Sequence, residues 1–240
     1  RKAGMERADL LEKNANIFSV QGKALAQNAN KDVKIFVVGN PCNTNALIAM
    51  HHAGGAIPAE NIFAMTMLDE MRARTQIADK AGVHVTDIKH CAVWGNHSAT
   101  QYPDIYNTLI NGKSAAEVIN DQDWVNDTFL PTVQKRGAAI IAARGASSAA
   151  SAANAIVQSV YNLTHDTPDD EWFSVACHSN GEYGVDEDLM FSFPCRLIDG
   201  VLHKVLDLKH DAYSEEKIQA TLQELRDERD AIIKLGLISG

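Results

Sequence analysis

The chain lacks the features that mark several classes of protein. It contains no apolar run near the ~20 residues that a membrane helix needs. Its first residues, Arg1-Lys2-Ala3-Gly4-Met5-Glu6-Arg7, include no hydrophobic stretch of the kind found in a secretory signal. Basic charge is not in excess either, because the net charge is −9 at pH 7, which argues against a nucleic-acid-binding surface. We therefore expect a soluble globular protein, and its 240 residues can bury a sizeable core.

Cysteine is scarce, and its spacing gives no sign of a metal or disulfide framework. The four cysteines are scattered and form no C-x-x-C pair, which indicates a reducing compartment. We therefore expect a cytoplasmic protein. The neighbouring His51 and His52 could suggest a metal site, but no Glu or Cys stands at a useful ligand spacing from them, so we expect no bound metal. The cysteines are Cys42, Cys91, Cys177 and Cys195.

The glycine-rich fingerprint of dinucleotide-binding sheets is also missing. Neither G-x-G-x-x-G nor G-x-x-G-x-x-G occurs in the sequence. No predicted strand ends in the acidic residue that would bind the adenosine ribose of such a nucleotide. The residues that normally hold a dinucleotide's phosphates and adenosine are therefore not expected within this chain.

What the sequence does contain begins with a strand–helix–strand pattern. Residues 33–38 form a nearly continuous β-branched run, which favours a buried strand of a parallel sheet. Gly39-Asn40-Pro41 ends this strand, and a helix capped by Asn43 or Thr44 is expected to follow. Residues 62–67 give a second apolar strand. A βαβ unit of this kind predicts the α/β fold class.

Beyond residue 68 the pattern changes to helices and then to antiparallel strands. We place the single domain boundary there, with residues 1–68 belonging to the parallel sheet and residues 69–240 forming an α+β domain. The predicted helices are residues 69–81, 121–143 and 148–163 and a last helix capped by Ser214, and the predicted strands are residues 88–94, 172–178, 188–193 and 196–207.

The clearest chemical pattern combines Asp69, Arg72 and His97. Asp69 and Arg72 are three residues apart and share one face of a helix, while His97 follows Gly95 in a polar loop. An Asp beside a His orients the imidazole and favours its protonated form, and an adjacent Arg can hold a carboxylate with two hydrogen bonds. The trio indicates proton transfer at a small, acid-bearing substrate. The ordinary alternatives are an i,i+3 surface salt bridge and a structural histidine.

Three further groups of residues have both a functional and a structural interpretation. Asn40 directly follows an apolar strand, where ligands bind in open α/β sheets, but it could be only a turn or capping residue. Arg1 and Arg7 flank a glycine-containing segment, which could be an anion-binding lid or only a solvated basic stretch. Ser147 and Ser148 could cap the Ala-rich helix that follows them or line a pocket.

Taken together, these segments resemble the lactate/malate dehydrogenase family, in particular its cytosolic and chloroplast-type malate dehydrogenase branch. The resemblance covers the whole chain, and the matching segments occur in the order found in that family. They are residues 1–7, which look like the mobile substrate loop, residues 38–45, which look like the strand-end motif, residues 68–72 and 94–104, which look like the catalytic segments, and residues 133–137 and 147–151.

This resemblance implies a role for each candidate residue. It makes His97 the general acid/base that takes the proton from the malate hydroxyl, and Asp69 the residue that holds His97 and stabilises its imidazolium. Arg72 would hold the C1 carboxylate of the substrate, and Arg1 would hold the second carboxylate. Arg7 would polarise the carbonyl of oxaloacetate as negative charge develops on it.

The resemblance also implies NAD as the cofactor, with NADP left open. Asn40 would hydrogen-bond the substrate and lie beside the nicotinamide, and Asn14, Gln21, Val38 and Gly39 match positions that line the NAD site. Hydride transfer itself belongs to the nicotinamide. The implied protein is a cytoplasmic homodimer that acts on a small dicarboxylate, with no nucleic-acid or membrane partner.

The chain begins inside the segment that resembles the mobile loop. We therefore expect a fragment, with a Rossmann-type sheet of which only the last strands are present and an α+β catalytic domain after it. We expect such a fragment to have little activity alone. The alternatives are a hydroxyacid dehydrogenase with a lactate-like preference and a catalytically inactive, dimerising fragment.

Overall fold

The computed structural model describes the backbone of residues 7–239 and the side chains of residues 14–239. Two compact units make up this part of the chain. Residues 7–65, 176–191 and 222–239 belong to the first unit, and residues 66–175 and 192–221 belong to the second. The boundary predicted after residue 68 separates two continuous stretches of the sequence, whereas each of these units combines several stretches. That boundary stays a prediction.

The first unit contains the predicted strand–helix–strand pattern. Strands β1 (Ile35–Val37) and β2 (Ile62–Ala64) are paired in parallel, and helix α2 (Cys42–Ala53) connects them. On its other side β2 pairs antiparallel with the last part of β8 (Phe173–His178). Among the described residues, β1 pairs only with β2. The βαβ unit and the α/β class are thereby confirmed.

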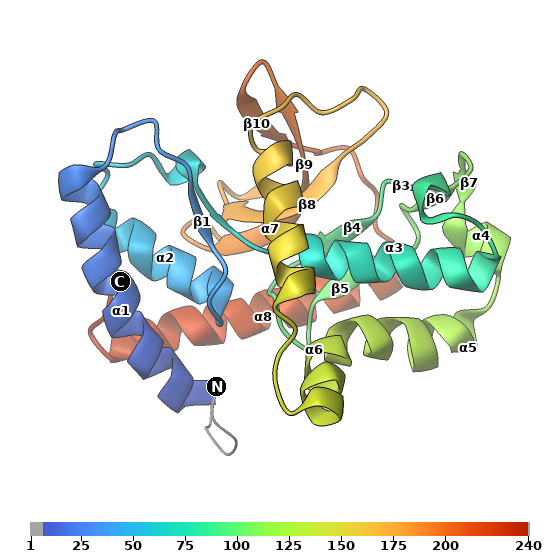
Figure 1. Cartoon of the computed structure of the whole chain (residues 1–240), viewed down its shortest axis with the longest axis horizontal. Coiled ribbons are helices and arrows are strands. Elements are labelled where there is room, and N and C mark those ends of the chain that lie inside the picture. The colour runs from blue at the N-terminus through green and yellow to red at the C-terminus, as the bar shows by residue number, and fades with distance from the viewer. Residues whose placement is uncertain (1–6, 240) are drawn as a thin grey trace. The chain divides into compact units, whose positions relative to one another are not determined.

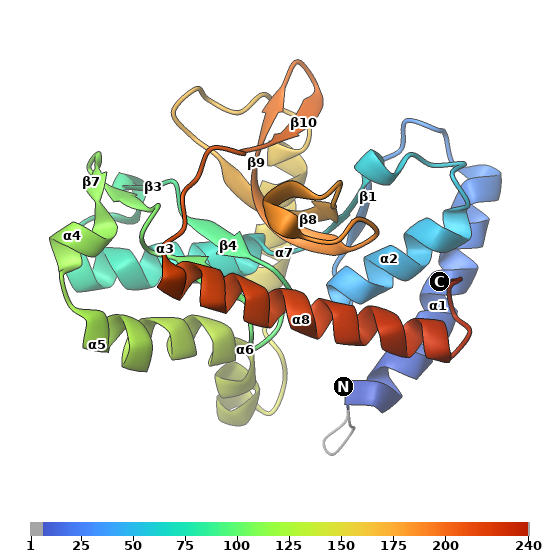
Figure 2. The same ribbon diagram turned by 180° about the vertical axis from the view of Figure 1, so that it is seen from behind.

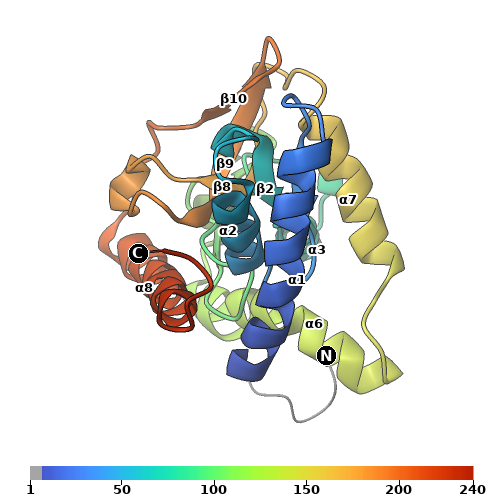
Figure 3. The ribbon, with the colours of Figure 1, turned by 90° about the vertical axis from the view of Figure 1, so that its left-hand side faces the viewer.

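Helix α1 (Arg7–Asn28) packs along α2, as Figure 3 shows. Gly22 permits this close approach, because a Cβ there would lie 2.5 Å from the carbonyl oxygen of Ala49. The two helices and the strands enclose an apolar core, and each large aliphatic side chain in it contributes about 1.5–3 kcal/mol through burial. Its larger members are Val37, Leu47, Ile48, Ile57, Ile62, Met190, Ile232 and Ile238.

The predicted cap of α2 is wrong. The helix begins at Cys42 after Pro41, which makes no side-chain cap, so Asn43 and Thr44 lie inside the first turn. Both side chains have other, buried partners. Asn43 donates from Nδ2 to the carbonyl oxygen of Met190 at 2.9 Å, and the Thr44 hydroxyl bonds the carboxylate of Glu228. Because buried polar groups need partners, these contacts outweigh local capping.

The second unit is organised around helix α3 (Met67–Ala81), which packs against α6 (Leu130–Arg144) and α7 (Ala150–Asn162) (Figure 1). Gly82 ends α3 in the left-handed conformation, as predicted. Figure 2 shows the first half of helix α8 (Ala212–Lys234) passing strand β4 (Ala92–Trp94). This unit also contains the helices α4 (Ala115–Ile119) and α5 (Gln122–Trp124), while α8 ends in the first unit.

The strand predicted over residues 88–94 is interrupted. His90 adopts a positive φ of 57° and divides it into β3 (Ile88–Lys89) and β4 (Ala92–Trp94). The two halves then pair differently, because β3 joins β6 and β4 joins β5 (Tyr102–Asp104). The partial alternation of these residues favours a single strand and does not reveal such a break. The strands paired beside β3 are β6 (Leu109–Ile110) and β7 (Lys113–Ser114).

The break predicted between residues 193 and 196 is also misplaced. One strand, β9 (Met190–Ile198), runs through this region, and β10 (Val201–Lys204) returns antiparallel to it. The turn falls at Asp199 and Gly200, which both have positive φ. A two-residue turn with two positive φ values matches the twist of a hairpin.

The last predicted helices are present but differ in detail. Residues 122–144 are helical with a π-type segment, Val125–Phe129, between α5 and α6. Helix α8 begins before Ser214, and the amide N–H of Ser214 donates to Asp211 Oδ1 at 2.8 Å. Asp211, and not Ser214, therefore caps the helix. Within residues 7–239, every helix is too short or too polar to cross a membrane.

Candidate active site

The structure brings Asp69 and His97 into direct contact within the second unit. Asp69 lies in the first turn of α3, and His97 lies in the loop between β4 and β5. The Nδ1 atom of His97 hydrogen-bonds Oδ2 of Asp69, whose side chain is completely buried, while 17% of the His97 side chain remains exposed. A neutral imidazole that donates from Nδ1 carries its basic lone pair on Nε2. The pair is thus arranged to accept or deliver one proton.

Arg72 completes the predicted trio. Its Nη1 donates to Asp69 Oδ1 at 3.1 Å, so the i,i+3 pair on α3 is formed. Asp69 is buried, however, so this is not the exposed surface salt bridge of the ordinary alternative. Arg72 also lines a cavity of about 350 Å³ together with Gln76, Arg136 and Ser151. A guanidinium in a cavity beside an acid–base pair can hold a carboxylate.

A third donor to Asp69 is Gln101, whose importance the sequence did not reveal. Its Nε2 lies 3.3 Å from Asp69 Oδ1, and its side chain is buried. The main-chain carbonyl of Gln101 accepts a hydrogen bond from Gln134 Nε2 of α6 at 2.8 Å. Both oxygens of Asp69 therefore have fixed partners. The motif around His97 includes Gln101, but nothing in its spacing identified Asp69 as the partner.

The loop that carries His97 is anchored at its start. Gly95 exchanges two backbone hydrogen bonds with Ser192 of β9, at 3.1 and 3.0 Å. The Ser192 hydroxyl bonds the carbonyl of Val93 at 2.6 Å and the hydroxyl of Thr66 at 2.8 Å. Since Thr66 is the residue before α3, these contacts link the origin of the loop to the origin of the helix that bears Asp69.

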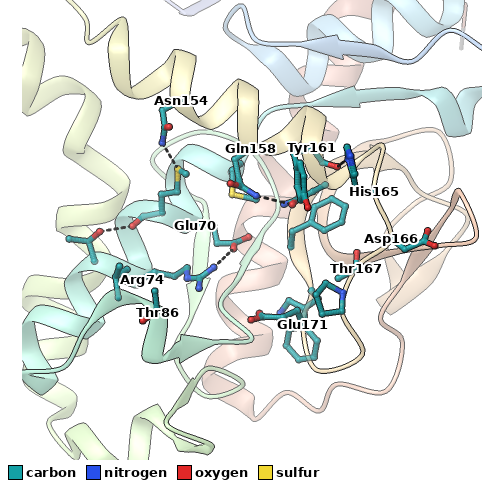
Figure 4. A pocket seen from close by; sticks show the side chains of 18 residues that line it. Glu70, Arg74, Thr86, Asn154, Gln158, Tyr161, His165, Asp166, Thr167 and Glu171 are labelled. Atoms are coloured by element: carbon teal, nitrogen blue, oxygen red, sulfur yellow. Dashed lines mark hydrogen bonds and ion pairs between the residues drawn. The ribbon is translucent and has the colours of Figure 1, made fainter.

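Glu70 is a second buried carboxyl group on α3. It lines a cavity of about 560 Å³, and Figure 4 shows it beside Arg74, whose Nη1 lies 3.7 Å from Glu70 Oε1. Its Oε2 accepts the amide N–H of Ser174 at 2.6 Å. Burial raises the pKa of Glu70 to about 7, an effect that Arg74 and the Ser174 amide only partly offset and that Glu171 reinforces. Glu70 is therefore close to its titration point at neutral pH.

The other predicted residues gather at the carboxyl end of β1, in the first unit. Gly39 and Asn40 are exposed there, directly after β1 and Val38. Asn14 of α1 donates from Nδ2 to the carbonyl oxygen of Asn40 at 2.6 Å. Asn45 Nδ2 in turn donates to the carbonyl of Gly39 at 2.8 Å.

The remaining predicted site residues are Gln21, Arg7 and Arg1. Gln21 lies on α1, seven residues after Asn14, and its side chain is exposed. Arg7 is the first residue of α1, but its side chain lies outside the described part of the chain. Arg1 lies entirely outside the described residues.

The structure gives hydrogen-bond partners for His51, His52 and Ser148. His51 Nε2 bonds the Asp188 carboxylate at 2.9 Å, and His52 Nε2 bonds the carbonyl of Leu237 at 2.7 Å. Among the described side chains of residues 14–239, no group of three or more His, Cys, Asp or Glu is placed to hold a metal ion. Ser148 pairs with Ser151, which lines the cavity beside Arg72.

Comparison with known proteins identifies the family. The lactate/malate dehydrogenase alpha/beta C-terminal domain matches residues 66–235, and the NAD binding domain of the same family matches residues 1–64. The chain belongs to the lactate/malate dehydrogenase family. It is therefore an oxidoreductase of a family that uses NAD.

Solved structures of this family are similar along nearly the whole chain. A malate dehydrogenase from Naegleria fowleri is 45% identical, with a TM-score of 0.91 over 98% of this chain and 72% of that chain. A Trichomonas vaginalis lactate dehydrogenase in complex with NADH and oxamate is 34% identical, with a TM-score of 0.92 over 99% of this chain and 74% of that chain. A malate dehydrogenase from Plasmodium falciparum, at 22% identity and a TM-score of 0.85, shares the fold.

These likenesses establish the family but not the substrate. Both malate and lactate dehydrogenases resemble this chain. The choice of substrate in this family member must therefore be argued from its own residues.

Proposed function

We propose that this protein interconverts (S)-malate and oxaloacetate with NAD, using His97 as its acid–base group. The observation that carries the proposal is the buried Asp69, which hydrogen-bonds His97 through one oxygen and Arg72 through the other. A secondary alcohol can lose its hydride only as its hydroxyl proton leaves, so a positioned base is required. The 45% identity to a malate dehydrogenase supports malate as the substrate.

The second unit supplies the proton chemistry. In malate oxidation, neutral His97 accepts the hydroxyl proton at Nε2 while Nδ1–H stays bonded to Asp69. Asp69 keeps its charge and stabilises the imidazolium that forms. Arg72 holds the C1 carboxylate, which brings the hydroxyl into reach of His97. In oxaloacetate reduction, the same imidazolium returns the proton.

The predicted roles of Arg1 and Arg7 are part of this proposal. Arg1 binds the second carboxylate, which distinguishes a four-carbon diacid from lactate. Arg7 polarises the substrate carbonyl in the transition state, where a fixed positive charge has its greatest effect. Both belong to the segment that resembles the family's mobile loop.

The residues at the carboxyl end of β1 fit the nicotinamide half of the cofactor. The backbone of Gly39 and Asn40 is exposed at a parallel strand end, and Asn14 and Asn45 fix its carbonyl groups. Ligands of open α/β sheets bind at such ends. When bound, the nicotinamide accepts or supplies the hydride. Val38, Gly39 and Asn40, with Asn14 and Gln21 on α1, would hold it there.

Steady-state assays of the full-length enzyme test the proposal. With NAD, malate should be oxidised with a much higher kcat/KM than lactate, and His97→Asn should nearly abolish turnover while NAD binding by calorimetry stays intact. A loss of NAD binding in His97→Asn would instead make His97 structural. Equal or better turnover of lactate would reject the dicarboxylate assignment.

A lactate-like preference is the second candidate. It is supported by the likeness to the Trichomonas vaginalis lactate dehydrogenase, which has a TM-score of 0.92. Substitution of Arg1 separates the two candidates, because Arg1→Gln should shift preference from oxaloacetate toward pyruvate. An unchanged preference would refute the role of Arg1.

Three further expectations remain proposals with direct tests. Sedimentation should show a homodimer, and imaging of the tagged protein should show it in the cytoplasm. An assay of residues 1–240 alone, with malate and NAD, tests the expectation that this chain has little activity by itself. Robust turnover would show that expectation to be wrong.

A further inference from the structure

Thr221 of helix α8 contacts the His97 loop from a position 124 residues further along the sequence. Its side chain is completely buried. The amide N–H of Asn96 donates to Thr221 Oγ1 at 2.9 Å, and the hydroxyl of Thr100 donates to the same atom at 3.0 Å. One hydroxyl on a helix therefore bonds the loop on both sides of His97.

The backbone of the loop is shaped to meet Thr221. Gly95 has a φ of 90°, and a Cβ there would lie 2.1 Å from Thr221 Cγ2. Only glycine accommodates both the backbone conformation and the close approach. The methyl group of Thr221 thus packs against the first residue of the loop, while its hydroxyl bonds the second.

The contact continues through the loop by way of Thr100 and Ser98. The Ser98 and Thr100 hydroxyls lie 2.9 Å apart, and the amide N–H of Thr100 donates to Ser98 Oγ at 3.1 Å. These residues flank His97 on its carboxyl side. Because α8 is a long regular helix, the hydroxyl of Thr221 is held in place and can fix the position of the loop that it bonds.

We propose that Thr221 is a positioning residue for the acid–base pair, whose hydroxyl holds the His97 loop so that Nδ1 stays on Asp69. In this arrangement it acts through its hydrogen bonds with Asn96 and Thr100. Preorganisation of this kind lowers the cost of reaching the reactive geometry. The inference rests on the proposed acid–base role of His97.

The test compares Thr221→Val, Thr221→Ser and Thr164→Val in the full-length enzyme. Valine keeps the shape and removes the hydroxyl, whereas serine keeps the hydroxyl and removes the methyl group. Thr164 is the matched control, because its exposed hydroxyl bonds the carbonyl of Val160 at 2.7 Å and Nδ1 of His165 at 3.0 Å, both near the end of its own helix. A lost hydrogen bond in a preorganised site should lower kcat about 5–10-fold.

Thr221→Val should therefore show a kcat about 5–10-fold lower, an unchanged KM for NAD and a larger kinetic isotope effect with 2-deuterated malate. Thr221→Ser should stay within about 2-fold of the parent, and Thr164→Val should match the parent. A role in stability alone would lower the melting temperature without changing kcat or the isotope effect. That result, or equal losses in the valine and serine variants, would overturn the proposal.

A second measurement remains informative even if malate is not the substrate. Nitrogen-15 NMR of the His97 imidazole reports whether Nδ1 stays hydrogen-bonded. In Thr221→Val the Nδ1 signal should broaden or move toward that of a solvated imidazole, and Thr100→Val should change it in the same way. An unchanged Nδ1 signal in both variants would reject the positioning role. An inactive parent enzyme with these NMR changes would reject only the proposed function.

Discussion

The two regions that carry the predicted site residues are built differently. In the second unit, Asp69 is completely buried and takes hydrogen bonds from His97, Arg72 and Gln101. In the first unit, Gly39 and Asn40 are exposed after β1, and their carbonyl groups receive side-chain donors from nearby residues. The first arrangement fixes charges before a ligand arrives, whereas the second presents backbone to a ligand. Substitutions in the two regions should therefore change different kinetic constants.

The largest effect is expected for His97→Asn. Removal of the general acid/base should lower kcat for malate oxidation about 10³-fold or more, since positioned proton transfer contributes about 10²–10⁴-fold. Stopped-flow measurement of NADH absorbance gives the rate of the chemical step. His84→Asn is a matched control, because His84 is an exposed histidine that caps the turn Val85–Asp87 of the same unit. A loss of comparable size in the control would remove the special role of His97.

Asp69→Asn is expected to follow, with a kcat about 10²-fold lower. Asparagine keeps the shape but lacks the charge that stabilises the imidazolium, and it no longer balances Arg72. NAD affinity, measured by fluorescence titration, should change little. If NAD affinity fell as much as kcat, the separation between the two regions would be wrong.

Glu70→Gln sharpens the comparison, because Glu70 is equally buried on the same helix but bonds the Ser174 amide and not His97. Its folded-state pKa of about 7 lies above the ordinary value of 4.5. The native state therefore holds this proton more tightly, and its stability falls as pH rises from about 4.5 to 7. The glutamine variant should gain up to about 3 kcal/mol over the parent above pH 7 and nothing below pH 4.5.

Urea unfolding at pH 4.5, 6 and 8 measures this difference. A constant difference at all three values would contradict the raised pKa of Glu70. The kcat of Glu70→Gln should stay within a few-fold of the parent, because burial of a carboxyl group does not by itself make it catalytic.

The smallest effect is expected for Asn14→Ala. Loss of its hydrogen bond to the Asn40 carbonyl should raise the KM for NAD about 2–10-fold and leave kcat nearly unchanged. Asn28→Ala on the same helix is the control, since the Asn28 side chain bonds the carbonyl of Ala24 within its own helix. A fall in kcat without a change in KM would assign Asn14 to the chemical step.

The main candidate residues of the site could be predicted from the sequence, but the contacts that hold them in place could not. Asp69 and Arg72 could be placed together because their i,i+3 spacing puts them on one helix face, and His97 was added by its polar loop and by the family resemblance. Thr221 was not, since its hydroxyl meets Asn96 only after the chain has folded. One signal was present, because Thr221 lies three residues after Ile218 and directly before Leu222, on the apolar face of its helix. A polar residue at a core position requires a partner.

The errors in the fold have related causes. Asn43 and Thr44 are good capping residues, but they bond Met190 and Glu228, which are distant in sequence. Residues 88–94 are predicted as one strand, yet the positive φ of His90 separates β3 from β4. The parallel strands and the end of α3 at Gly82 were predictable, because local patterns alone decide them.

The pH dependence of kcat/KM in both directions tests the central claim most directly. Neutral His97 is needed to oxidise malate and protonated His97 to reduce oxaloacetate, so the first activity should fall at low pH and the second at high pH. In Asp69→Asn the pH at which each activity falls should be lower than in the parent, because the imidazolium loses its stabilising charge. The proposed role of the pair would be contradicted if both activities fell at the same end of the pH range, or if Asp69→Asn left both pH values unchanged.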